Sequence, residues 1–146
     1  MRKINYIVVH CSATREGCTL TSEALEAEHR RRGFRTTGYH YYIRRDGTVL
    51  GTRSLELPGA HCRGHNKYSI GICYEGGLDA RGNPKDTRTP EQRAALHLLV
   101  YQRLQQFRNA RLCGHRDLSP DLDGDGTVEP WEWVKQCPCF EVSKEF

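Results

Sequence analysis

Short runs of β-branched and aromatic residues alternate along this chain with segments in which apolar residues recur at helical spacing. The first run, Ile-Asn-Tyr-Ile-Val-Val at residues 4–9, is typical of a buried strand. Asp46-Gly47 forms a tight turn between two further runs and predicts a β-hairpin. The strands predicted in this way are residues 4–9, 39–44, 48–50, 69–74 and 111–114.

Two segments carry the signals of amphipathic helices. Ser22 is the predicted N-cap of a helix over residues 23–32, which Gly33 ends. Thr89-Pro90-Glu91-Gln92 predicts a capping box that begins a helix over residues 90–107. Because strands and helices alternate, the predicted fold class is α/β, with a mixed β-sheet flanked by helices. The predicted apolar face of the second helix consists of Ala95, Leu96, Leu98, Leu99, Val100 and Leu104.

Composition places the chain among ordinary globular proteins. Of its 146 residues, 37% are hydrophobic and 27% charged, so residues 1–146 are expected to form a single domain around one core. No apolar run approaches the roughly 20 residues of a membrane span. The basic start lacks the apolar stretch of an export signal, so we expect cytoplasmic synthesis and no membrane partner. The net charge of +4 gives a mild attraction to polyanions without discriminating among them.

Seven cysteines and seven histidines are the unusual counts in this composition. An odd number of thiols without even spacing argues against a disulfide framework. His10 follows the first predicted strand, His115 follows the last, and Cys137 lies in Lys-Gln-Cys-Pro. Two imidazoles and a thiolate suit Zn²⁺, and three protein ligands leave a tetrahedral position for water, as in catalytic sites. Residues at the carboxyl ends of neighbouring strands are able to converge, although spacing alone does not establish it.

Six motifs follow one another along nearly the whole chain. They are Val-Val-His-Cys-Ser-Ala-Thr at 8–14, Gly-Tyr-His-Tyr at 38–41, Arg-Asp-Gly-Thr-Val at 45–49, Ala-His-Cys-Arg-Gly-His-Asn at 60–66, Ser-Ile-Gly-Ile at 69–72 and Lys-Gln-Cys-Pro-Cys-Phe at 135–140. This order resembles that of phage-type N-acetylmuramoyl-L-alanine amidases, and the combination is specific. The resemblance implies the zinc amidase fold that is related to peptidoglycan recognition proteins.

The resemblance also implies a function and a site. It implies hydrolysis of the amide bond between the lactyl group of N-acetylmuramic acid and L-alanine, in peptidoglycan or in a muropeptide. It implies that His10, His115 and Cys137 bind zinc, while Tyr39 and Lys135 complete the active site. Zinc lowers the pKa of a bound water to about 7 and polarises the scissile carbonyl. Tyr39 is able to hydrogen-bond that water or the developing oxyanion, and Lys135 to place a positive charge beside it.

Each further site residue has an alternative interpretation. His61 and Asn66 match positions that line the substrate groove of the family, and the alternative is that they are ordinary surface-loop residues. Apart from the resemblance, Tyr39 is interpreted as a packing residue on the same face of its strand as Tyr41. Lys135, on the same basis, is a solvated surface lysine.

The remaining histidines and cysteines are mostly interpreted as structural. His29 and His40 are expected to be hydrogen-bonded packing residues. Cys139 lies two residues after Cys137 and is a competing zinc ligand, although Pro138 constrains the turn between them and favours Cys137. The cysteines predicted to act as small buried hydrophobic residues are Cys11, Cys62, Cys73 and Cys113.

An acidic insertion, residues 117–132, departs from the short phage form of the family. Read from Asp121, it supplies every ligand position of the twelve-residue calcium loop. Ser119-Pro120 precludes an entering helix, and Asp and Gly are also ordinary turn residues, so a plain turn is the alternative. Calcium here is expected to stabilise the loop rather than join the chemistry. The candidate Ca²⁺ ligands are Asp121, Asp123, Asp125, Thr127, Glu129 and Glu132.

A noncatalytic peptidoglycan-binding module of the same fold is the alternative function, since relatives of the fold bind muropeptides without cutting them. Such modules usually lack a zinc ligand, whereas this chain keeps all three positions. No nucleic-acid partner is expected, because zinc-finger spacing is absent and aromatic residues do not alternate with the basic run at residues 29–35. A monomer is expected, either an endolysin of a phage or prophage that acts on the wall after release, or a cytoplasmic enzyme of wall turnover.

Overall fold

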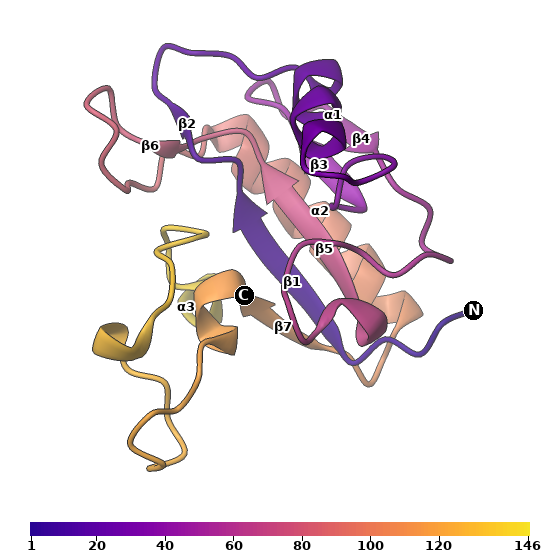
Figure 1. Cartoon of the computed structure of the whole chain (residues 1–146), viewed down its shortest axis with the longest axis vertical. Helices are drawn as coiled ribbons and strands as arrows, with labels where there is room; N and C mark the ends of the chain where they lie inside the picture. The colour runs from indigo at the N-terminus through magenta and orange to yellow at the C-terminus, as the bar shows by residue number, and fades with distance from the viewer.

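The computed structural model describes all 146 residues, and its centre is a mixed five-stranded sheet (Figure 1). The strand order is β4-β3-β5-β1-β7, in which only the edge strand β4 runs antiparallel to its neighbour. All five strands predicted from the sequence are present, and the predicted mixed α/β class is confirmed. Their bounds are β1 (Tyr6–Cys11), β3 (Tyr41–Ile43), β4 (Val49–Gly51), β5 (Ser69–Tyr74) and β7 (Arg111–Gly114).

Two helices cover the two faces of this sheet. α2 (Pro90–Gln106) lies behind the sheet in Figure 1, where Leu96, Leu99 and Val100 join the larger core cluster with residues of β1, β3 and β5. α1 (Ser22–Arg31) packs Leu25 against Tyr42 and Cys73 on the other face. Side chains alternate along each strand, so β3 and β5 contribute to both cores.

The structure corrects two details of these predictions and confirms two others. Leu98 is 60% exposed, because it lies two residues from Leu96 and therefore on the far side of α2. The N-cap of α1 is Thr21 rather than Ser22, since the Thr21 side chain accepts a hydrogen bond from the Ala24 N–H. The Asp46-Gly47 turn and the capping box of Thr89 and Gln92 form as predicted.

The strand predicted over residues 39–44 is shorter than expected, and this moves Tyr39. β3 begins only at Tyr41, so strand alternation does not extend back to Tyr39. Tyr39 therefore packs with Tyr42 on the α1 side, whereas Tyr41 packs against the core on the α2 side. The prediction that Tyr39 and Tyr41 share one face is therefore wrong. Tyr39 lies instead on the side of the sheet that carries His10.

Several short elements have no clear sequence signal. β2 (Thr14–Arg15) and β6 (Gly77–Leu78) pair as a small parallel sheet beyond the ends of β1 and β5. None of the helices has the length and apolar character that crossing a membrane requires. All seven cysteines are free thiols. The other unpredicted elements are the 3-10 helices η1 (Asn66–Tyr68), η2 (His115–Leu118) and η3 (Pro130–Glu132), and the short C-terminal helix α3 (Val142–Glu145).

Candidate metal centre and its pocket

The register of two parallel strands brings His10 and His115 together. Val9 of β1 lies opposite Gly114 of β7, so the next residue of each chain segment falls at the same edge of the sheet. The ring centroids of His10 and His115 are 4.5 Å apart. His10 lies inside β1, one residue before its end, and not after the strand as predicted. It projects to the same face as its register partner Cys73, which is the face that α1 covers.

Backbone contacts fix the segment that carries Cys137 against the same edge. The Arg116 N–H donates to the Cys137 carbonyl at 2.9 Å, and the Tyr74 hydroxyl donates to the Pro138 carbonyl at 2.6 Å. The thiol of Cys137 accepts a hydrogen bond from the Cys11 N–H at 3.2 Å and lies 3.8 Å from His10 Nδ1. The Cys11 N–H thus helps to hold the sulfur of Cys137 beside His10.

His10, His115 and Cys137 thus offer ligand atoms that all lie within 4.8 Å of one another. The convergence predicted from the sequence is present. Two imidazole nitrogens and one thiolate form a borderline-soft donor set that suits zinc better than magnesium or calcium. Three ligands of a tetrahedron also leave one coordination position for water or substrate.

Burial keeps the imidazole of His10 neutral, as a metal ligand must be. Its side chain is 1% exposed, and burial lowers its pKa well below the usual value, helped by the nearby rings of His61 and His115 and the ammonium of Lys135. The pKa of His61 falls to about 3, mainly through burial. Neutral imidazoles need not release protons before they bind a metal ion.

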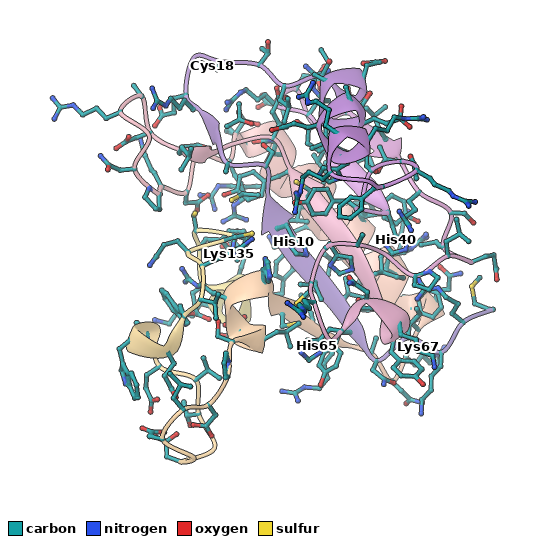
Figure 2. All side chains as sticks on the ribbon, in the orientation of Figure 1. His10, Cys18, His40, His65, Lys67 and Lys135 are labelled. Atoms are coloured by element: carbon teal, nitrogen blue, oxygen red, sulfur yellow. The ribbon has the colours of Figure 1, made fainter.

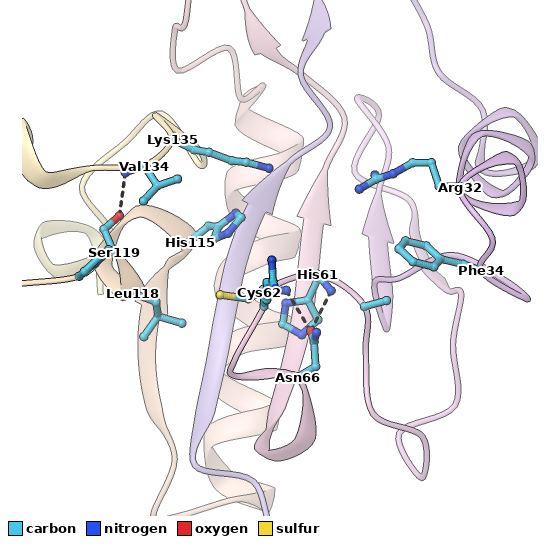
Figure 3. A pocket seen from close by; sticks show the side chains of 13 residues that line it. Arg32, Phe34, His61, Cys62, Asn66, His115, Leu118, Ser119, Val134 and Lys135 are labelled. Atoms are coloured by element: carbon cyan, nitrogen blue, oxygen red, sulfur yellow. Dashed lines mark hydrogen bonds between the residues drawn. The ribbon is translucent and has the colours of Figure 1, made fainter.

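Two adjoining cavities open onto this group. The smaller, of about 260 Å³, contains all three candidate ligands together with Tyr39 and Lys135. The larger, of about 480 Å³, extends outward past Lys135 and His115 (Figure 3). Figure 2 shows His10 and Lys135 at the same edge of the sheet, where the C-terminal segment meets β1. A groove of this kind is able to hold an extended substrate with one bond close to the metal group.

Tyr39 and Lys135 line the same cavity as the candidate metal group. The Tyr39 ring lies 5.1 Å from that of His10, centroid to centroid, and burial first, then the neighbouring thiols, raises its pKa well above the usual value. Its hydroxyl therefore remains a hydrogen-bond donor at neutral pH. Lys135 is exposed and extends into the pocket in Figure 3. The catalytic roles of both residues stay a prediction.

His61 and Asn66 line the larger cavity, but their polar atoms are mostly engaged elsewhere. His61 Nδ1 lies 2.8 Å from His10 Nε2, and His61 Nε2 lies 3.1 Å from the Ser69 hydroxyl. Asn66 Oδ1 accepts the N–H groups of His61 and Cys62, both at 2.9 Å, and so shapes the loop (Figure 3). Their role in substrate binding stays a prediction, and neither is a loosely held surface-loop residue.

The other histidines and thiols predicted to be structural are largely so. His29 accepts the Gly38 N–H, and His40 accepts the Gly71 N–H and contacts the Leu57 carbonyl. Cys139 points away from the metal group toward Cys11, with 4.0 Å between the sulfurs, and donates to the Gly77 carbonyl. Of the four cysteines expected to be buried, Cys11, Cys62 and Cys73 are, whereas Cys113 is half-buried.

The acidic segment collects its carboxylates without one common centre. Asp121, Asp123 and Glu132 form one cluster, and Asp123, Asp125 and Glu129 form a second. Asp121 accepts two N–H groups of its own loop, and Glu132 accepts those of Leu122, Asp123 and Glu129. The crowded carboxylates of Glu132 and Asp125 raise the pKa of Glu129 to about 8. Calcium binding by Asp121, Asp123, Asp125, Thr127, Glu129 and Glu132 stays a prediction.

Some residues of the pocket carry no distinctive sequence signal. Arg32 and Phe34 border the larger cavity from the end of α1, with the Arg32 guanidinium 5.3 Å from the Phe34 ring centroid (Figure 3). The sequence explains the basic run there only by the favourable interaction of positive charges with the C-terminal end of a helix. Glu28 is the one carboxylate among the residues that line the two cavities. Its helical phase relative to Leu25 could have indicated its position.

The fold and the site define the class of an α/β protein with a candidate metal centre, in which two imidazoles and a thiol converge at one edge of a mixed sheet. The chain belongs to the family described as N-acetylmuramoyl-L-alanine amidase, whose sequence profile matches residues 1–138. The endolysin of Klebsiella phage KP32 is 35% identical over 98% of this chain and 85% of its own length. The endolysin of Escherichia phage T7 is 33% identical over 94% of this chain and 82% of its own length.

Solved structures agree with this assignment. The N-acetylmuramoyl-L-alanine amidase LysC from Clostridium intestinale superposes with a TM-score of 0.75, at 26% identity over 99% of this chain and 82% of its own. Peptidoglycan recognition protein SA of Apis mellifera gives a TM-score of 0.73 at 21% identity, over 99% of this chain and 82% of its own, and shows the fold alone. The chain is therefore a phage-type amidase domain related to peptidoglycan recognition proteins.

Proposed function

We propose that this chain is a zinc-dependent hydrolase that cleaves the amide bond between the lactyl group of N-acetylmuramic acid and L-alanine in peptidoglycan. The observation that carries the proposal is the convergence of His10, His115 and Cys137 in a cavity that adjoins a second, larger one. Their donor chemistry fits zinc. Membership of the amidase family and the endolysin relatives support the substrate class.

The residues around the pocket have different roles in the proposed hydrolysis. Zinc, when bound, supplies an activated water and polarises the scissile carbonyl. The Tyr39 hydroxyl, which stays protonated, donates a hydrogen bond toward the oxygen on which negative charge develops. The Lys135 ammonium provides a compensating positive charge at the same place. His61 and Asn66 shape the wall of the groove that receives the substrate.

The test is release of free L-alanine amino groups from purified peptidoglycan, measured together with zinc content. We expect one zinc per chain, loss of release on chelation, and recovery when zinc is returned. The His10→Ala variant should release none, because it removes a buried ligand. Release that persists both after chelation and in His10→Ala would contradict the proposal.

A noncatalytic wall-binding module of the same fold is the second candidate, and it is favoured by the likeness, at 26% identity, to peptidoglycan recognition proteins solved with tracheal cytotoxin bound. It predicts retention on insoluble peptidoglycan without release of amino groups. The amidase predicts both retention and release. The three converging ligands and the pocket around Lys135 favour the amidase.

For biological role, we propose an endolysin that is made in the cytoplasm, acts on the cell wall after release and works as a monomer. The endolysin relatives support this assignment. Faster cleavage of intact sacculi than of soluble muropeptides is the expected result, and the reverse order would indicate a wall-turnover enzyme. Sedimentation of the purified chain, expected as one species of 16.8 kDa, tests the monomer.

Calcium binding by residues 121–132 is a separate prediction within this proposal. It is supported by the spacing of the carboxylates and by their two overlapping clusters. Isothermal titration with Ca²⁺, and with Mg²⁺ as the control, tests it directly. A saturable calcium signal that is absent from Asp121→Asn would support it, and identical weak signals from both ions would contradict it.

A further inference from the structure

His61 occupies an unusual place for a residue of a polar loop. Its side chain is 9% exposed, and both ring nitrogens have partners in buried elements. On one side Nδ1 lies 2.8 Å from Nε2 of His10 in β1, and on the other Nε2 lies 3.1 Å from the hydroxyl of Ser69, the first residue of β5. The three side chains form a short hydrogen-bonded relay that ends on a candidate metal ligand.

The direction of this relay follows from which nitrogen of His10 faces the metal group. His10 Nδ1 lies 3.8 Å from the Cys137 sulfur and is therefore the nitrogen available to a metal. A neutral imidazole that binds through Nδ1 carries its hydrogen on Nε2. His10 Nε2–H must then donate to His61 Nδ1, and the hydrogen of His61 lies on Nε2, where it donates to Ser69.

Two glycines fix the plane of the His61 ring. A Cβ atom added at Gly59 would lie 2.4 Å from the ring, and one added at Gly71 would lie 2.7 Å from it. Both distances are too short for any side chain, so the ring packs directly on backbone at these two positions. Two hydrogen bonds and two such contacts leave His61 one orientation, and the orientation of His10 follows from it.

We propose that His61 is a positioning residue that sets the tautomer and ring orientation of His10 for metal binding. The effect of His61 on metal binding rests on the proposed zinc function. The hydrogen-bonded relay itself does not, because it is present in the metal-free chain. Partners of this kind raise the basicity of an imidazole ligand and hold it in the binding geometry. His61 would thus act on the metal through His10, without direct contact.

The tautomer is measured first, on metal-free protein, by long-range ¹H–¹⁵N correlation of labelled imidazoles. We expect His10 to be the Nε2–H tautomer in the wild type and in His61→Asn, whose amide oxygen can replace Nδ1 as acceptor. In His61→Leu, which removes the acceptor, His10 should become a mixture of tautomers. His29→Leu is the matched control, since His29 is a buried histidine that accepts the Gly38 N–H and hydrogen-bonds to neither His10 nor His61. A wild type with Nδ1–H on His10, or unchanged signals in His61→Leu, would overturn the proposal.

Zinc affinity is measured next, by competition with a chromophoric chelator. His61→Leu should bind zinc about 10- to 100-fold more weakly, while His61→Asn and His29→Leu stay close to the wild type. Ser69→Ala, which leaves His61 in place, should produce a smaller loss in the same direction. Equal losses in His61→Leu and His29→Leu would show a general effect of destabilisation and overturn the role. A wild type that binds no zinc would contradict the proposed function, and the tautomer result would stand apart from it.

Discussion

Two regions of this chain gather metal-ligating side chains, and they do so by different means. His10 lies in β1, His115 directly follows β7, and Cys137 lies in a distant C-terminal segment. The sheet register places the two histidines, and contacts such as that of the Arg116 N–H with the Cys137 carbonyl place the thiol. The carboxylates of residues 121–132 come from one loop and are arranged largely by that loop's own N–H groups. The first group is positioned by the folded core, and the second mainly by local turns.

The two regions also differ in their electrostatics. His10 is buried, and its lowered pKa keeps the imidazole uncharged in the metal-free chain. The carboxylates of the acidic segment crowd one another, and the pKa of Glu129 rises to about 8 in response. The neutral imidazole of His10 does not have to lose a proton before it binds a metal ion, whereas the mutual repulsion of the crowded carboxylates is relieved when a cation or a proton binds. The difference predicts separate responses to mutation.

The largest effect is expected from the thiol that completes the first group. Cys137→Ala should lose bound zinc and lower amidase activity on the order of 10³-fold or more, because a ligand of the hydrolytic metal is removed. Cys139→Ala should retain one zinc per chain, because its sulfur points toward Cys11. Zinc content and amino-group release are measured on the same preparations.

The exposed Cys18 supplies the control for this pair of variants. Cys18→Ala should match the wild type in zinc content and activity. Zinc loss in Cys139→Ala with retention in Cys137→Ala would reverse the assignment of the ligand and place the centre elsewhere in the C-terminal segment.

A smaller loss is expected from Lys135, which links the two regions because it follows the acidic segment and enters the pocket of the first. Lys135→Met should reduce kcat about 100-fold, a magnitude typical of losing one group that stabilises transition-state charge. Zinc content should stay at one per chain. Lys3→Met, at another exposed lysine, is the control, and equal activities in the two variants would remove Lys135 from the mechanism.

The sequence predicted the first region better than the second for a physical reason. The long elements have strong periodic and capping signals, and Thr89 with Gln92 forms the capping box expected of it. Once β1 and β7 are neighbours, the convergence of His10 and His115 follows from strand order. Strand order itself depends on contacts far apart in the chain, so residue spacing alone left that convergence open.

The errors occur where local pattern competes with tertiary contacts. Tyr39 lies on the opposite side from Tyr41 because β3 begins late, and no local signal marks that start. The hydrogen-bonded relay through His61 also could not be predicted from the sequence, because it depends on close packing of the ring against Gly59 and Gly71. A histidine in a polar loop is ordinarily expected at the surface.

In the acidic segment, Glu132 is the carboxylate with the most structural contacts. It is 3% exposed and accepts the N–H groups of Leu122, Asp123 and Glu129. Glu132→Gln should lower Tm by a few degrees in calcium-free buffer, since the charge that strengthens these bonds is lost. Zinc content and activity should stay near the wild type, and Glu56→Gln, at an exposed site, should change neither Tm nor activity. A loss of zinc in Glu132→Gln would show that the two regions are coupled.

The smallest effect is expected from Glu129, and it depends on pH. Its folded-state pKa of about 8 lies above the ordinary 4.5, so the folded chain binds this proton more tightly than the unfolded chain does. The resulting stabilisation is complete below pH 4.5 and is lost as the pH rises through 8. Glu129→Gln cannot titrate here. Its Tm relative to the wild type should therefore rise across this window, as scanning calorimetry can measure.

The same measurement in the presence of Ca²⁺ tests whether the crowded carboxylates bind a cation. A cation held by the acidic segment would neutralise the repulsion that raises the pKa of Glu129, so saturating Ca²⁺ should flatten the pH dependence of the wild type. The variant should respond less, because it has lost one of the charges. A Tm difference between the two proteins that stays constant from pH 4.5 to pH 8 would show that Glu129 is not strained by its neighbours. In that case the contrast with the neutral, buried His10 group would rest on geometry alone.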